Sequence, residues 1–164
     1  MMPSPAVEFD MAVRSVVTID APPAEVWSGL ARLQDWKPSV VSVERLGGAA
    51  EGEEGETLRV GQRPGDSTVY VIMRTIRSLP HEWKLQTLRT EDGDATDGYV
   101  SYSLLAEQGG TRLCCAAVAR CRVPLPPGVG SGRDLERIVT ASTLEKLEAD
   151  LVRLKQLVEH GRKR

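Results

Sequence analysis

The amino-acid sequence predicts an α+β fold in which a seven-stranded antiparallel sheet curls around a long C-terminal helix. Residues 40–123 hold six consecutive strand-like segments with short links, which favours an antiparallel meander. From about Gly132 onward, apolar residues instead recur at helical spacing. A length of 164 residues suits one domain, with its core at about 8–160 and a basic tail at 161–164.

The first strand is expected at Glu8–Ile19, where apolar and polar residues alternate with a period of two. It stops at Asp20–Pro23, because two prolines cannot continue a strand ladder but suit the first turn of a helix. That helix has an apolar face formed by Val26, Leu30 and Leu33. One further short helical turn is expected before Pro38.

The remaining strands are separated by turns rich in Gly, Pro and Asp, such as Arg63–Asp66 and Glu91–Asp94. We expect them at Val40–Leu46, Glu56–Val60, Thr68–Ile76, Trp83–Thr90, Gly98–Ala106 and Thr111–Val123. The final helix, at about Gly132 to His160, has a stripe made of Leu144, Leu147, Leu151, Leu154 and Val158. A coiled coil is the competing interpretation of this stripe, but the sheet needs a cover and no other element is long enough.

Charge and hydropathy restrict the classes of binding partner and the cellular locations that we expect. The formal net charge of −2 gives no general reason to expect nucleic acid or an acidic membrane surface as a partner. No run approaches the roughly 18 apolar residues that a membrane span needs, so stable membrane insertion is not expected. Residues 1–8 lack the apolar core of a signal peptide, and a cytoplasmic location is the default expectation. The oligomeric state, monomer or dimer, is left open.

The amino-acid sequences of several segments resemble those of a known superfamily. Val17–Trp27 reads VTIDAPPAEVW, Trp36–Pro38 reads WKP, and Gly110–Leu113 reads GTRL before Pro124. These segments are similar to the START-like or polyketide cyclase/dehydrase (SRPBCC) superfamily, which includes the birch-pollen-allergen-like proteins. The resemblance spans about residues 9–158. It implies a helix-grip fold with the order β-α-α-β6-α and a cavity between the sheet and the last helix.

The last strand gives independent support for a cavity. One face carries Cys115, Ala117, Ala119 and Cys121, and the other carries Cys114, Ala116 and Val118. Small side chains on either face leave room beneath the helix, and only 4% of the residues are aromatic. A core filled by closer approach of the helix is the alternative.

The sequence offers few groups arranged for chemistry. His81 lies in an expected turn and His160 at a helix end, so neither suggests a general base. There is no nucleophile motif or phosphate-binding loop, and the spacing of Cys114, Cys115 and Cys121 does not suit zinc. We therefore name no catalytic residue, no metal site and no cofactor.

Most candidate pocket residues come from the strands, one comes from the short helical turn before Pro38, and two come from the start of the final helix. They are Trp36, Tyr70, Ile72, Arg74, Leu85, Thr87, Tyr102, Leu104, Cys115, Ala117, Leu135 and Val139. Which strand face lines the pocket stays open, since strand parity places Tyr70, Ile72 and Arg74 together on one face. An inward Arg74 would indicate an acidic ligand group, and the alternative is that it lies on the outer, wet face.

The leading functional hypothesis is the binding or transport of a small hydrophobic or amphipathic molecule between sheet and helix. A cyclase or dehydrase acting on an aromatic or polyketide-like substrate is the first alternative, with Tyr70, Arg74 or Tyr102 orienting carbonyls. The second is a protein-interaction module like the co-chaperones of the superfamily. The first two hypotheses both require an enclosed volume near Cys115.

Overall fold

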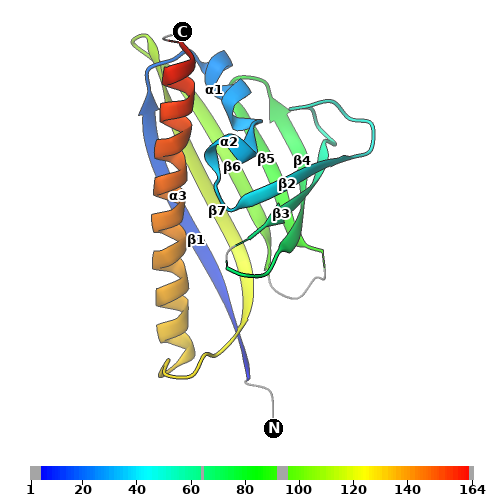
Figure 1. Ribbon diagram of the computed structural model, residues 1–164. Helices are drawn as coiled ribbons and strands as arrows, with labels where there is room; N and C mark the ends of the chain where they lie inside the picture. Colours follow the sequence, from blue (N-terminus) through cyan, green and yellow to red (C-terminus); the bar gives the residue numbers. More distant parts are fainter. Residues whose placement is uncertain (1–4, 64, 92–95, 163–164) are drawn as a thin grey trace.

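In a computed structural model, which describes residues 5–63, 65–91 and 96–162, the strands form one twisted sheet that curves around α3 (Figure 1). The strands are β1 (Ala6–Ile19), β2 (Val40–Leu46), β3 (Thr57–Gln62), β4 (Val69–Leu79), β5 (Trp83–Thr90), β6 (Thr96–Glu107) and β7 (Gly110–Pro124). The helices are α1 (Pro23–Leu30), α2 (Leu33–Trp36) and α3 (Gly132–Arg162). Most of the expected turn at Glu91–Asp94 and half of the basic tail lie outside the described residues.

The sheet has seven strands in the order β1-β7-β6-β5-β4-β3-β2, and every neighbouring pair is antiparallel. The first strand therefore joins the last, with a continuous register from Ala6 opposite Pro124 to Ile19 opposite Thr111. This confirms the predicted fold class and the meander of six strands. β4 runs on to Leu79, past the expected end at Ile76, and its register with β5 shifts between Thr75 and Arg77.

α3 packs its apolar stripe against the concave face of the sheet, so the coiled-coil alternative is wrong. Leu147, Leu151, Leu154 and Val158 are all buried, and α3 contacts β1 along its length (Figure 1). α1 and α2 cover the other part of that face and also contact α3. A Cβ atom at Gly29 of α1 would come within 2.7 Å of Val158 Cγ2, so this position allows α1 to approach α3 closely.

α1 begins as the two prolines predict. Pro23 is its first residue, and Glu25 lies in the first turn, where a carboxylate interacts favourably with the positive end of the helix dipole. The buried side chains Val26 and Leu30 then anchor the helix to the core.

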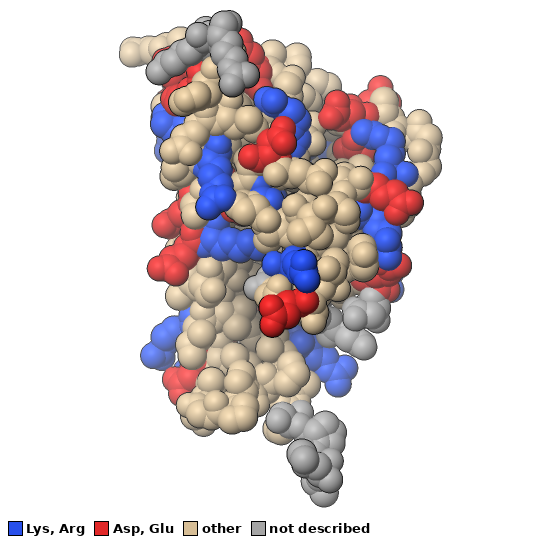
Figure 2. All heavy atoms as spheres, in the orientation of Figure 1, with Lys and Arg blue, Asp and Glu red and all other residues tan. Residues whose placement is uncertain are grey.

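The surface seen in Figure 2 carries acidic and basic side chains interspersed along α3 and around the far edge of the sheet. Charges of both signs therefore alternate on this face. None of the helices in the described ranges is long and apolar enough to cross a membrane.

Candidate functional site

A cavity of about 150 Å³ lies between the concave face of the sheet and α3. The sheet contributes apolar wall residues from all seven of its strands, including Val13, Val60, Met73, Leu88 and Val100. The helical side contributes Leu33, Thr143 and Leu147. An engineered apolar cavity of about this volume holds benzene, so the space fits about one ring or a short alkyl chain.

The cavity exists because β7 presents small side chains to α3. Cys115 and Ala117 line it, and Ala119 continues the same inward face. On the opposite face of β7, Arg14 Nε of the neighbouring strand donates to Cys114 Sγ at 3.1 Å. The filled-core alternative is therefore wrong, and a partly open cavity lined by Cys115 is present.

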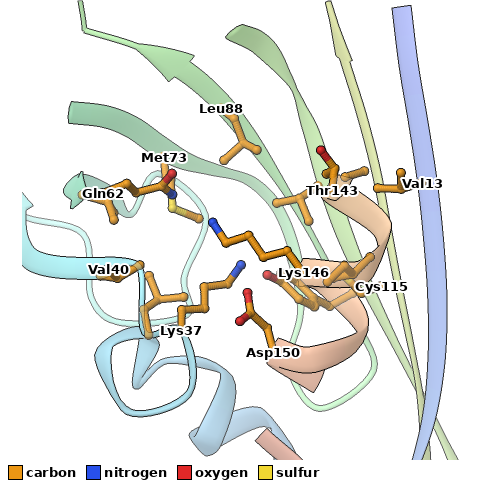
Figure 3. A pocket seen from close by; sticks show the side chains of 16 residues that line it. Val13, Lys37, Val40, Gln62, Met73, Leu88, Cys115, Thr143, Lys146 and Asp150 are labelled. Atoms are coloured by element: carbon orange, nitrogen blue, oxygen red, sulfur yellow. The ribbon is translucent and has the colours of Figure 1, made fainter. Parts of the chain in front are cut away.

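One end of the cavity is charged. Lys37 follows α2, whereas Lys146 and Asp150 project from α3, and the three head groups converge on one region (Figure 3). Asp150 is buried, Lys37 is half-buried and Lys146 is exposed. Lys146 is therefore the most exposed of the three residues.

Lys37 and Asp150 have altered pKa values. Burial lowers the pKa of the Lys37 amine, against the opposing attraction of Asp150. Burial likewise raises the pKa of the Asp150 carboxyl, against the opposing charges of Lys37 and Lys146. In the described ranges, no hydrogen bond or ion pair within 4.0 Å satisfies the Lys37 amine, the Lys146 amine or the Asp150 carboxylate.

The backbone on both sides of Lys37 is fixed. The Lys37 N–H donates to Leu33 O at 2.9 Å, and Lys37 O accepts from the Val40 N–H at 3.0 Å. The Lys37 Nζ atom lies 4.8 Å from the ring centroid of Trp36, within cation–π range. The link between α2 and β2 therefore directs this amine toward the cavity.

Tyr102 and Cys115 form the neutral part of the lining. Burial raises the pKa of the Cys115 thiol to about 11. It also raises the pKa of the Tyr102 hydroxyl, an effect to which the neighbouring Cys115 adds. Both groups are protonated at neutral pH, so Cys115 is not an activated nucleophile.

Three of the residues named from the sequence line this cavity, namely Tyr102, Cys115 and Ala117. Four others lie on the inward side without lining it. Trp36 packs edge-on against Tyr102, with 6.5 Å between ring centroids, and its Nε1 donates to Leu30 O at 3.4 Å. Leu104 and Leu135 are buried core residues, and the half-buried Val139 packs against the core.

The other five candidates, Tyr70, Ile72, Arg74, Leu85 and Thr87, lie on the convex face of the sheet and do not line the cavity. Strand parity explains the correction, because Met73 and Thr75 of β4 and Gln86 and Leu88 of β5 take the concave face. Tyr70 instead stacks with Arg59, whose guanidinium carbon lies 3.7 Å from its ring centroid. Arg74 is exposed.

Sequence reasoning missed the charged end of the site. Asp150 carried a detectable signal, since it lies three residues after Leu147 and four before Leu154, on the apolar stripe of the helix. A carboxylate on such a stripe points into the interior. Lys37 carried no comparable signal, because its direction depends on how the link before β2 is packed.

A second, smaller cavity of about 50 Å³ lies beneath α1 and is lined by polar and apolar residues in about equal measure. Its lining includes Arg45, Glu56, Lys84 and Gln86. The Glu56 carboxylate accepts from Arg45 Nη1 at 2.9 Å and from the Gly52 N–H at 3.2 Å. Gln86 Nε2 donates to Thr75 Oγ1 at 3.2 Å, so this region is held together by its own polar contacts.

Comparison with known proteins agrees with this architecture. Residues 10–159 match the family described as polyketide cyclase/dehydrase and lipid transport. No curated protein matches the chain in sequence.

Solved structures show the same fold. The Zhui aromatase/cyclase from a Streptomyces species is 16% identical, with a TM-score of 0.70 over 95% of this chain and 97% of that one. A Thermus thermophilus protein is 21% identical, with a TM-score of 0.65 over 92% and 98%. The protein Ara h 8.0201 is 16% identical, with a TM-score of 0.62 over 92% and 98%. At these identities the likeness establishes the fold alone.

Proposed function

Because this chain belongs to the polyketide cyclase/dehydrase and lipid transport family, we propose that it binds a small hydrophobic or amphipathic molecule in the cavity between the sheet and α3. The observation that carries the proposal is the combination of apolar walls from all seven strands with one charged end. Such a site holds an apolar body by burial and fixes its orientation through a few polar groups.

The expected affinity is modest. Burial of about 200 Å² of apolar ligand surface contributes about 5 kcal/mol at ~25 cal/mol per Å², before the costs of association. A short alkyl chain or single ring is therefore expected to bind weakly unless the charged end adds to its affinity.

Two substitutions on β7 test the proposal. Ala117→Leu places a larger side chain in the cavity, whereas Ala116→Leu makes the same change on the convex face of the same strand. We expect wild type and Ala116→Leu to bind indole, a neutral apolar probe, with similar affinity by calorimetry. Ala117→Leu should lose this binding at least tenfold. Equal binding by both variants would remove the cavity from the proposed function.

An enzymatic role of the cyclase or dehydrase type is the second candidate, acting on an aromatic or polyketide-like substrate. The observation in its favour is that Lys37 and Asp150, with shifted pKa values, share the cavity with Tyr102. A carboxyl and an amine whose charged forms are both disfavoured suit proton transfer near a carbonyl group.

Turnover and binding separate this candidate from simple binding. With a synthetic aromatic poly-β-ketone as substrate, Asp150→Asn should reduce kcat at least a hundredfold while substrate binding by calorimetry persists. Absence of any turnover by the wild type, with binding intact, would leave binding as the function.

A further inference from the structure

We propose that the charged end of the cavity recognises a carboxylate, so that the ligand is a small apolar acid held by Lys37 and Lys146. The inference rests on the proposed function, since it names the chemical class of molecule that the same cavity takes. Its geometric basis is the convergence of two ammonium groups from different elements on one region of the lining (Figure 3).

The charges of this region are not balanced within the protein. Two ammonium groups face one carboxylate, and they are the only lining residues in the described part of the chain with side chains that are normally ionised at neutral pH. Neither amine forms an ion pair within 4.0 Å there. The Lys37 amine is half-buried, and a buried charge is costly unless paired, so a ligand anion beside it would offset a cost that the unliganded protein carries.

The excess of one positive charge at this end of the cavity favours a singly charged anion. One excess positive charge is neutralised by a carboxylate, whereas a doubly charged phosphate would leave a net negative charge beside Asp150. A cationic ligand would be opposed by the two amines. Gln62, which also lines the cavity from β3, provides an amide within the same region (Figure 3).

The positions of the two amines fit a ligand whose apolar body enters the cavity first and whose acid group follows. Lys146 is exposed and Lys37 is half-buried, while Met73, Leu88 and Val100 line the apolar part of the cavity. An apolar body resting on that wall would leave its acid group near the two ammonium groups. Asp150, which lines the same end of the cavity, would disfavour a ligand anion there.

Two isosteric probes test the inference, 3-phenylpropanoate and its neutral amide, 3-phenylpropanamide, titrated by calorimetry into the full chain. We expect the acid to bind wild type at least tenfold more tightly than the amide, since charge-assisted contacts are stronger than neutral ones. Lys37→Met and Lys146→Met should each reduce this preference severalfold. Asp150→Asn should strengthen acid binding.

Arg137→Met is the matched control, because it removes one positive charge from the exposed surface of the same helix without touching the cavity. It should retain the full preference for the acid. Equal affinity for acid and amide would overturn the carboxylate assignment and leave the proposed function standing. Tighter binding of the corresponding amine, 3-phenylpropylamine, would overturn it in favour of Asp150 as the recognising group. Failure of all three probes to bind would overturn both.

Discussion

Two groups of polar side chains lie beneath the same sheet and differ in how their hydrogen bonds are satisfied. Under α1, Glu56 accepts from Arg45 and from the Gly52 N–H, and Gln86 donates to Thr75. At the cavity, no hydrogen bond or ion pair among the described residues satisfies the head groups of Lys37, Lys146 or Asp150. Polar groups that satisfy one another stabilise a fold, whereas those left unsatisfied beside a cavity are available to a ligand.

Lys84, in the region under α1, is surrounded by aromatic rings and carboxylates. Its amine is buried, and its Nζ atom lies 5.4 Å and 5.5 Å from the ring centroids of Trp27 and Tyr102. Burial lowers the pKa of this amine, and the charges of Glu56 and Glu51 oppose that effect. Glu56 therefore supports both Arg45 and Lys84.

The largest expected effect on stability comes from removing the Glu56 carboxylate. Glu56→Ala removes the carboxylate and leaves the Lys84 amine buried without its principal counter-charge. We expect a loss of about 3 kcal/mol in the free energy of unfolding, measured with urea. Glu53→Ala, an exposed change in the same loop, is the control and should cost less than about 0.5 kcal/mol. Equal effects of the two substitutions would remove the distinction between the two polar regions.

At the cavity, removing a carboxylate is expected to increase the free energy of unfolding. The folded-state pKa of Asp150 is raised, so the folded protein holds that proton more tightly than the unfolded chain, and stability is lost as pH rises through the folded-state pKa. Asp150→Asn removes this loss. At pH 7 it should raise the free energy of unfolding, and the gain should shrink as pH falls toward the ordinary Asp range.

Urea unfolding at pH 7 and pH 4 checks this prediction, with the exposed change Glu148→Gln on the same helix as control. A destabilised Asp150→Asn protein at pH 7 would mean that the carboxylate contributes to the fold, and that the contrast with the region under α1 does not hold.

The smallest expected effect concerns the rates at which two cysteine thiols are alkylated. Cys115 is buried and the pKa of its thiol is raised to about 11, whereas Cys114 is half-buried on the convex face. Iodoacetamide at pH 8 should therefore modify Cys114 at least tenfold faster than Cys115, as followed by peptide mass spectrometry. Faster modification of Cys115 would mean that the cavity activates its thiol.

The fold could be predicted from the sequence because its patterns are redundant. The period-two alternation of β1, the turns between strands and the leucine stripe of α3 all indicate the same architecture. The site could be predicted only in part. β4 carries apolar side chains on both faces, so its periodicity did not distinguish the face of Met73 from that of Ile72.

The charged end required more than periodicity. Asp150 interrupts the apolar stripe at a position that helical spacing identifies, and in retrospect that interruption marks the cavity. The direction of Lys37 follows from the backbone bonds that hold the link between α2 and β2, which are set by tertiary packing. Local pattern carries no information about that packing.

Methyl NMR of the full chain titrated with 3-phenylpropanoate tests directly whether the space beneath α3 binds a ligand. We expect saturable shifts of the methyl groups of Met73, Leu88 and Val100, which come from three different strands but line one cavity. The methyl groups of Leu105 and Val118, exposed on the convex face, should not move. Shifts confined to those exposed residues, or no shift of the wall at saturating probe, would contradict the claim that the space beneath α3 is a ligand site.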